Sequence, residues 1–513
     1  MTEEVPDTDP GGLPLSGRMR FLQGEPVTEP LPLADTLRNT PYRDPRAMEA
    51  PGQEASVRGA LELAVRVGEL LLRCGASTRD VEAAVVAVAA AAGLRRLEVD
   101  ITNQSLLVQA PTPSGVPVTW LRVVRSNTRD FARLTAVHRL VEDLVSGGID
   151  DVAAATKKLR RIQRKSRIYP RWMVGLGYAG LAGSVCAVLG GHTMAIVVSI
   201  VSVLLVDRVG RWLSKHAVPS FYSSAAGGAI SVVLAWFGYL IGIHGWLGIY
   251  MPPTEFGYAI AAGIVVLLPG RAMASAVEDA VTGYPVTGAG RLLTVFLATS
   301  GIIVGIAAGL SLTLRLDKAL DLQLTALPLT GAHTTATAQL ALDFASQPAA
   351  LWLQVVCGAF GAICSAVSAR VLPKHLLPAG LLGAIGLLLS GGLPSKVSIG
   401  GFHFGATTSI AIAAIVIGLA GRFIGLRLGA PALVLVVPAV SPLLPGLRIF
   451  RGMYDAVSGS VIGTSVATQG EALSTLMGAA AIALAISTGV VLGDAMSAPL
   501  DRQALRRRRA RHR

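Results

Sequence analysis

Ten strongly apolar runs fill the C-terminal part of the chain and set the first expectation. Several are shorter than the roughly 20 residues that a helix needs to cross the hydrocarbon of a bilayer. Two short runs, the fourth and the ninth, both end at the sequence Leu-Leu-Pro-Gly. The pattern predicts a helical polytopic membrane protein with ten transmembrane helices. The runs lie approximately at 172–190, 193–207, 223–243, 256–269, 292–314, 349–371, 376–392, 404–421, 430–445 and 473–493.

A mixed polar and apolar pattern precedes these runs and predicts a small soluble α+β domain over 54–156. Helical periodicity in VRGALELAVRVGELLLRCG ends at Gly75, a residue suited to a helix C-cap. Ser77 follows, with Asp80 three residues on, and opens the Ala-rich helix VEAAVVAVAAAAG. LEVDIT, SLLVQA and VPVTWLRVV favour strands, and DFARLTAVHRLVEDLVSGG favours an amphipathic helix.

The remaining segments are polar. Nine prolines and little apolar periodicity predict a disordered tail over 1–53. Residues 157–171 are a basic juxtamembrane linker, and 496–513 an Arg-rich tail. The longer polar stretch 315–348 divides the runs into two membrane repeats of five spans, 172–314 and 349–495.

Composition supports the membrane class and argues against a nucleic-acid partner. The chain is 52% hydrophobic and 15% charged, and its mean hydropathy is +0.57. The net charge is +13, and basic residues cluster beside the apolar runs. Positive charge is common next to membrane-spanning helices, so it needs no nucleic-acid partner here. The four cysteines indicate no disulfide framework, since the last three lie within apolar runs.

Loop charges predict the orientation of the spans. If the basic stretch 157–171 lies inside, the next inner loop holds Arg208, Arg211 and Lys215, whereas the first two outer loops hold neither Lys nor Arg. Ten spans return the Arg-rich tail to the inside, so both termini are expected in the cytoplasm. Nine or eleven spans would violate the rule at one end.

The Leu-Leu-Pro-Gly phrase extends into a longer repeat. LLPGRAMASAVEDAVTG starts at Leu267 and LLPGLRIFRGMYDAVSG at Leu443, and eight of seventeen positions are identical. An odd number of spans in each half makes the second copy point the opposite way. The expected architecture is therefore a 5+5 inverted repeat, related by a pseudo-two-fold axis in the membrane plane.

The repeated phrase predicts a substrate site. Pro269 and Pro445 should each end a helix, and Gly270 and Gly446 relax the backbone there. A half-helix starting after each break would offer unpaired amides and partial positive charge to a carboxylate. Such breaks at matching places in two halves indicate the binding site of a transporter.

A carboxylate follows each break, nine residues after the glycine. Asp279 and Asp455 are candidates for binding an ammonium group or relaying a proton. Alternatively, both are solvated loop residues paired with Arg271 or Arg451.

Among the remaining titratable residues, His192 is the third candidate for proton coupling, because imidazole changes charge near neutral pH. The histidines show no metal-ligand spacing, and we expect no metal or cofactor. Cys74 and His138 would be the nucleophile and base if the soluble domain were a hydrolase. No Walker-type phosphate loop is present.

Together with Gly75-Ala76-Ser77-Thr78 and Val81-Glu82, the duplicated phrase resembles the bacterial threonine/serine exporter family over about residues 54–495. The resemblance implies a soluble domain joined to ten spans in the inner membrane. It also implies export of L-threonine and L-serine driven by the proton motive force. The expected partners are these amino acids, protons and membrane lipids. The oligomeric state stays open, with a homo-oligomer compatible with the sequence.

Two other functions remain open from the residues alone. One is a membrane-anchored hydrolase that uses the soluble domain. The other is a small-solute channel that is indifferent to gradients. The residues themselves indicate only a secondary transporter for a small, zwitterionic solute.

Overall fold

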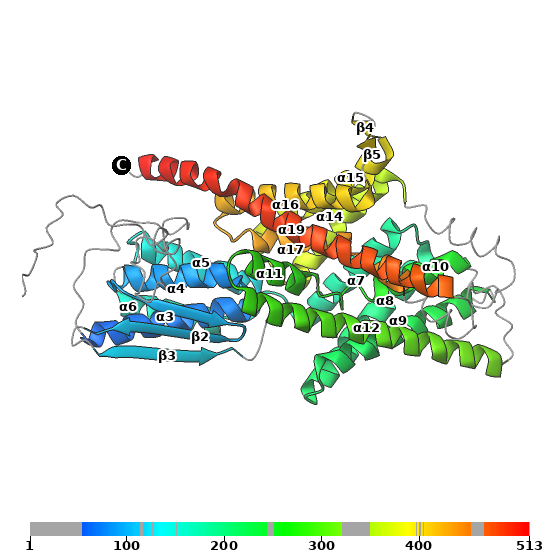
Figure 1. Cartoon of the computed structure of the whole chain (residues 1–513), viewed down its shortest axis with the longest axis horizontal. Coiled ribbons are helices and arrows are strands. Elements are labelled where there is room, and N and C mark those ends of the chain that lie inside the picture. Colours follow the sequence, from blue (N-terminus) through cyan, green and yellow to red (C-terminus); the bar gives the residue numbers. More distant parts are fainter. Residues whose placement is uncertain are drawn as a thin grey trace, which may run out of the picture.

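The chain forms a small α+β domain beside a larger bundle of helices (Figure 1). The computed structural model describes residues 54–112, 116–124, 128–149, 151–243, 251–320, 349–396, 398–399, 402–403, 405–452 and 466–511. The tail over 1–53, for which we predicted disorder, lies outside the described residues.

The α+β domain has the elements that the sequence predicts. The strands form an antiparallel meander in the order β1-β2-β3. Leu106, Val108 and Ala110 alternate along β2 and are fully buried, which gives the sheet one apolar face. The elements are α3 (Glu54–Cys74), α4 (Thr78–Ala91), β1 (Glu98–Thr102), β2 (Ser105–Pro111), β3 (Pro117–Val123), α5 (Phe131–Val145) and α6 (Val152–Arg164).

Helix α6 covers most of the stretch that we assigned to a juxtamembrane linker. The Asp151 side chain accepts hydrogen bonds from the amides of Ala153 and Ala154 and so caps the helix. Ala155 and Leu159 are buried against α3 and α5, while the basic residues face outward. The basic stretch is therefore part of the packed domain.

A helix coincides with each of the ten apolar runs. The first half holds α7 (Arg171–Val188), α8 (Thr193–Lys215), α9 (Ser220–Ile243), α10 (Pro253–Gly263), α11 (Gly270–Val281) and α12 (Pro285–Ala319). The second half holds α14 (Leu351–Ser368), η2 (Pro373–His375), α15 (Leu376–Lys396), the hairpin β4 (Ser398–Ile399) and β5 (Phe402–His403), α16 (Ala406–Leu428), α17 (Leu433–Val440), η3 (Ser441–Leu443) and α19 (Val466–Arg511).

Seven of the described helices are long and apolar enough to cross a membrane, or eight if the bent pair Leu433–Leu443 and Gly446–Gly452 is one span. The polytopic helical class is confirmed, but the count of ten is not reached among the described residues. Helix α10 has only 11 residues and α17 only 8. Helix α7 has 18, with an arginine at its start and four glycines.

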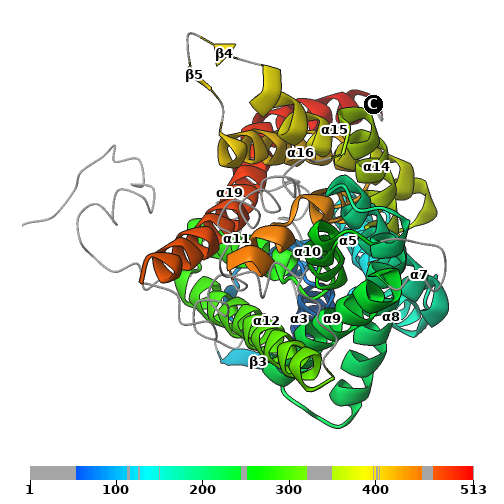
Figure 2. The same ribbon diagram turned by 90° about the vertical axis from the view of Figure 1, so that its right-hand side faces the viewer.

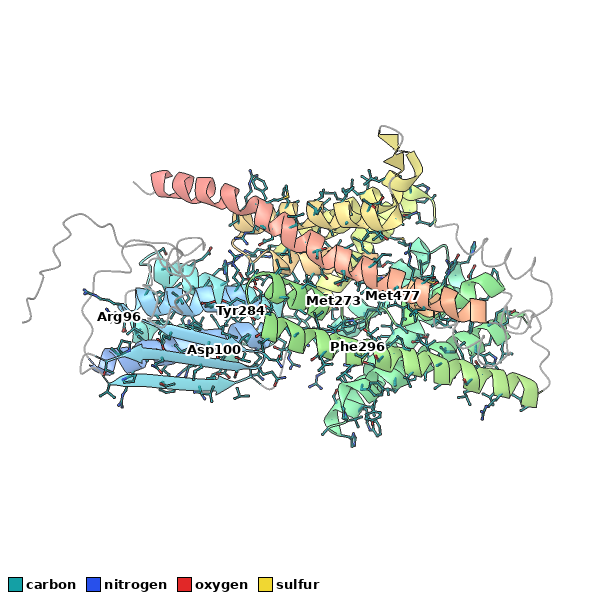
Figure 3. All side chains as sticks on the ribbon, viewed as in Figure 1. Arg96, Asp100, Met273, Tyr284, Phe296 and Met477 are labelled. Atoms are coloured by element: carbon teal, nitrogen blue, oxygen red, sulfur yellow. The ribbon has the colours of Figure 1, made fainter. Side chains whose placement is uncertain are left out.

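The outer surface of the bundle is apolar. Phe296 on α12 and Met477 on α19 are about two-thirds exposed, with values of 66% and 64%. Figure 3 shows these residues on the bundle, whereas the labelled charged residues Arg96 and Asp100 lie on the α+β domain. A soluble monomer rarely exposes an apolar surface of this extent, so the bundle matches a lipid environment.

The two halves pack in the same way. Helix α9 packs against α12, and α16 packs against α19. The short helix α10 contacts α7, α8 and α9, while α17 contacts α14, α15 and α16. In Figure 2, α10 and α11 lie inside a ring of longer helices.

Two pairs of helices from the two halves, α12 with α19 and α7 with α14, run in opposite directions. Figure 1 shows α12 leading away from the α+β domain and α19 returning toward it. Helices α7 and α14 cross closely at small residues, where Gly177 meets Ser368 and Gly361 meets Ser184. The contact partners descend along α14 as they ascend along α7, so this pair is antiparallel.

We predict that Gly177→Ala destabilises the protein. The added methyl would lie 2.7 Å from the Cys364 carbonyl oxygen and 3.0 Å from the Ser368 amide nitrogen, and backbone atoms yield little. Overpacking of this kind costs about 1–3 kcal/mol. Thermal unfolding of the detergent-purified protein should show a lower Tm.

Gly175→Ala on the same helix is the matched control. Its methyl would meet only a Leu204 side-chain carbon at 3.6 Å, an ordinary contact. Equal Tm values for the two variants would contradict close packing of α7 on α14.

Candidate functional site

Both predicted helix interruptions are present. In the first half, α10 ends at Gly263 and α11 starts at Gly270, with Pro269 as its N-cap. In the second half, the helix that follows η3 starts at Gly446 and is bent by 42° from the helix before it. Pro269 and Pro445 directly precede the two new helices, where a residue without an amide suits a helix start, while the helices before them end earlier, at Gly263 and Val440.

The two breaks contact each other. A methyl group added at Gly270 would lie 2.6 Å from Cδ2 of Leu444, and one at Gly446 would lie 3.6 Å from Cδ1 of Leu268. Each glycine therefore packs on the second leucine of the other phrase. The Ala261 carbonyl oxygen, 3.0 Å from the same methyl position at Gly446, tightens the contact. Glycine allows this close approach because it has no side chain.

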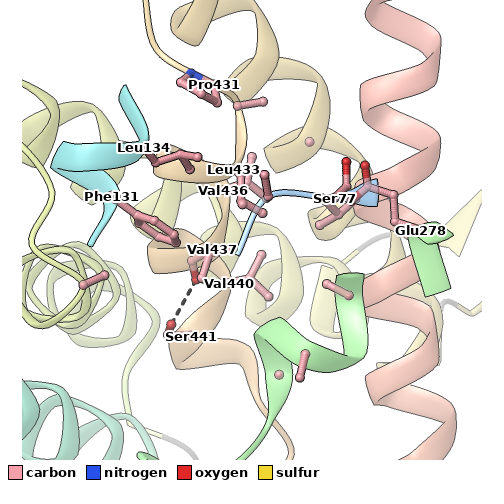
Figure 4. A pocket seen from close by; sticks show the side chains of 18 of the residues that line it. Ser77, Phe131, Leu134, Glu278, Pro431, Leu433, Val436, Val437, Val440 and Ser441 are labelled. Atoms are coloured by element: carbon pink, nitrogen blue, oxygen red, sulfur yellow. Dashed lines mark hydrogen bonds between the residues drawn. The ribbon is translucent and has the colours of Figure 1, made fainter. Parts of the chain in front are cut away.

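A cavity of about 640 Å³ extends from the breaks to the α+β domain (Figure 4). Its size is that of a small-molecule site. Pro269 and Gly270 line it, as does Leu444, whereas Pro445 and Gly446, the next two residues in sequence, are not among the lining residues. Its other walls include apolar residues of α17 and α19 and polar residues of α4, α11 and α16, among them Val436, Val440, Ile486, Val490, Ser77, Asp80, Glu278 and Arg422.

Asp279 lies behind the cavity wall rather than in it. Its carboxylate is fully buried and accepts a hydrogen bond from the Thr78 amide (2.9 Å) at the start of α4. Arg291 Nη1 lies 2.6 Å from Asp279 Oδ2, so the ion-pair partner is neither Arg271 nor Arg451. Burial raises the pKa of Asp279, and Arg291 and the Thr78 amide oppose the shift. Asp279 thus joins the half-helix α11 to the α+β domain. Its counterpart Asp455 lies outside the described residues.

His192 is at the far end of the bundle. Helix α7 starts next to the α+β domain and is about 27 Å long, and His192 follows its other end. The His192 amide donates to Oε2 of the buried Glu255 (3.0 Å), and its Nδ1 pairs with Oε1. Glu255 is in the first turn of α10, so this pair ties α8 to α10.

An aromatic cluster packs next to this pair at the far end. Phe256 packs edge-on against Tyr239 of α9 and Phe450 of the helix after the second break, each at 6.4 Å between ring centres. All three side chains are buried. The cavity therefore extends toward the α+β domain and not toward the end that holds His192.

Three polar groups in the cavity wall were not predicted from the sequence. Arg422 Nη1 lies 3.0 and 3.1 Å from the two carboxylate oxygens of Asp494, and the hydroxyls of Ser365 and Ser441 are 2.8 Å apart. Glu278 is the third. It was missed because Tyr454 occupies the matching position of the second phrase, so the repeat gives no signal there.

Glu278 has an unusual acidity for a carboxyl group. Burial raises its pKa to about 8, and the carboxylates of Asp80, Asp494 and Asp279 reinforce the shift, whereas a hydrogen bond with Ser77 opposes it. A group of this kind exchanges its proton near physiological pH.

The residues suggested for a hydrolase do not form a reactive pair. Cys74 is fully buried, and burial raises the pKa of its thiol to about 12, so the thiolate is scarce at neutral pH. His138 Nε2 faces Glu142 Oε1 at 3.6 Å. Within the described ranges, no group of three or more His, Cys, Asp or Glu residues is placed to hold a metal ion.

Two protein families match this chain, one over most of the α+β domain and the first half of the bundle, the other over the second half. The family described as "Putative threonine/serine exporter" matches residues 62–313, and "Threonine/Serine exporter, ThrE" matches 354–496. A "Probable threonine/serine exporter" of Mycobacterium tuberculosis is 33% identical over 444 residues, covering 86% of this chain and 77% of the relative. A "Threonine/serine exporter" of Corynebacterium glutamicum is 27% identical over 476 residues, covering 91% and 88%. No solved structure matches significantly.

We predict that Arg291→Met is strongly destabilising. It would leave the carboxylate of Asp279 buried without its cationic partner, which costs about 3–5 kcal/mol. The free energy of unfolding, measured by denaturant titration in detergent, should fall by this amount.

Lys158→Met is the control for loss of a lysine or arginine charge. The Lys158–Asp143 pair is about half exposed on both sides and should contribute less than about 1 kcal/mol. Similar losses in both variants would show that the Asp279–Arg291 pair has no special importance.

Proposed function

Because the chain belongs to the threonine/serine exporter family, we propose that it exports L-threonine and L-serine across the bacterial plasma membrane. Membership of this family makes the chain a multi-pass membrane transporter and not an enzyme. The two relatives are named as threonine/serine exporters, and these names support the choice of the two amino acids. The contact of two helix breaks beside a cavity is the structural observation that supports it most directly.

The two halves form an inverted repeat of five spans each in our proposal. Four observations support it: the repeated phrase, the matching helix contacts, the antiparallel pair α7 and α14, and the reciprocal packing of Gly270 and Gly446. The short helices α10 and α17 then count as halves of broken spans, and together with α7 they bring the seven long apolar helices to ten. Both termini lie on the cytoplasmic side in this arrangement.

The substrate binds where the breaks meet. The N-terminus of α11 at Pro269 and Gly270 lines the cavity and offers free amides to the substrate carboxylate. Pro445 and Gly446 directly follow Leu444, which lines the same wall. Asp279 acts as a positioning residue, since its carboxylate is bound by Arg291 and Thr78. Asp455 remains a predicted counterpart.

Export follows from rocking of the two halves about this site. The described conformation has its cavity on the side of the α+β domain and its aromatic cluster packed at the far end. Opening the far end requires separation of Phe256 from Phe450 and release of the His192–Glu255 pair. His192 is our candidate at this end for coupling export to the proton motive force, because its imidazole faces the buried carboxylate of Glu255.

Proteoliposomes preloaded with labelled threonine test the function. We expect an imposed proton gradient that is acidic on the acceptor side to accelerate release, with unlabelled serine competing inside. Glycerol-sized neutral solutes should not be released. Gradient-indifferent leakage would indicate the channel alternative, and the absence of any threonine release would contradict the proposal.

A second prediction tests the contact between the breaks. Gly270→Ala should slow gradient-driven export on the order of tenfold, which corresponds to about 1.4 kcal/mol, because its methyl overlaps Leu444. Adding Leu444→Ala removes the overlapping carbons and should restore most of the rate. Failure of the double variant to recover, with both variants correctly folded, would show that the two breaks do not act together.

A further inference from the structure

We propose that Glu278 is the residue at which a proton and the substrate's ammonium group exchange on the side of the α+β domain. The inference rests on the proposed function and adds the coupling step to it. Glu278 lines the cavity, and its position is not one of those at which the two copies of the repeated phrase are identical.

The position of Glu278 fits this role. It lies in α11, eight residues and about 12 Å after the break at Gly270, and it lines the same cavity. Figure 4 shows its carboxyl group next to Ser77, the N-cap residue of α4. Glu278 and the break at Pro269 and Gly270 therefore line one continuous cavity.

The charges around Glu278 favour a cation. Those that act on it most strongly are the carboxylates of Asp80 in α4, Asp494 in α19 and the adjacent Asp279. Two arginines of the same wall have partners: Arg422 is bound by Asp494, and Arg129 Nη1 donates to the Tyr178 hydroxyl (3.2 Å). Arg291, which does not line the cavity, is bound by Asp279. Arg79, and the His138–Glu142 pair on α5, complete the charged groups that face the cavity. Either a proton or an ammonium group relieves the repulsion among the carboxylates.

Asp279 and Asp494 are poorer candidates for the exchange. Arg291 and the Thr78 amide bind the carboxylate of Asp279, and Arg422 binds both oxygens of Asp494. A proton added to either one must first displace these partners. Glu278 has no such cationic partner among the charges that set its acidity.

The exchange involves no covalent step apart from proton transfer. With a pKa of about 8, Glu278 is mostly protonated at pH 7.5 and gives up its proton to water when an ammonium group takes its place. The carboxylate then neutralises the ammonium while the substrate carboxylate remains free to reach α11. After the substrate leaves on the far side, a proton restores the neutral form. One proton therefore enters for each amino acid exported.

Binding of labelled threonine to the purified full-length protein tests the exchange. Between pH 6 and pH 8 the Kd should fall about tenfold per pH unit and then level off, because a proton must leave before binding. A weakly buffered solution with a pH-sensitive dye should record about one proton released per threonine bound at pH 7. A Kd that does not change over this range in the wild type would overturn the inference.

Variants then identify the residue. Glu278→Gln should bind threonine weakly, with no pH dependence and no proton release, and its vesicles should lose gradient-driven export. Glu278→Asp should retain both pH dependence and proton release, which guards against simple misfolding. Asp143→Asn, at a half-exposed carboxylate that does not line the cavity, should behave as the wild type.

The outcomes separate this inference from the proposed function. If wild-type vesicles export threonine under a proton gradient and Glu278→Gln still does so with normal proton release, Glu278 is not the exchange residue but the exporter stands. If wild-type vesicles do not export threonine at all, the proposed function fails first.

Discussion

The contact between the two helix breaks is the constraint on which the rest of the membrane domain depends. Inside lipid, an interrupted helix leaves amides and carbonyls that need partners, so a break is tolerated only within protein or beside a polar cavity. Here each break meets this requirement through the other. Gly270 packs on Leu444 and Gly446 on Leu268, and the cavity begins where they touch. Loss of either glycine would separate the halves at the point that the substrate must reach.

The α+β domain forms hydrogen bonds with both halves of the bundle. Its Thr78 amide binds Asp279 in the first half, while the amides of Phe131 and Ala132 donate to the carbonyls of Ala369 and Arg370 in the second (3.1 and 3.0 Å). Because these bonds reach both halves, the rocking motion that we propose would strain one set of them. In that proposal, the domain favours the conformation in which the cavity faces it.

The sequence predicts the parts of this structure that depend on local pattern. Pro269 and Pro445 mark the breaks because proline cannot continue a helix, and Ser77 marks the start of α4 through its cap. The hydrogen bond from the Thr78 amide to Asp279 could not be predicted, since the two residues are 201 positions apart in the sequence. The described residues hold seven or eight full-length spans where composition predicted ten, because composition does not tell a short broken helix such as α10 from a complete span.

The duplication explains why the sequence did not point to Glu278. A repeat emphasises what its two copies share, and these copies share a break, an aspartate and a terminal glycine. Symmetry of this kind builds two similar half-helices, but a transport cycle needs directionality. Glu278 faces the cavity in one half, whereas the sequence has a tyrosine, Tyr454, and no carboxyl group at the matching position of the other. The departure from the repeat, and not the repeat itself, is therefore where a difference between the two sides of the membrane enters the chemistry.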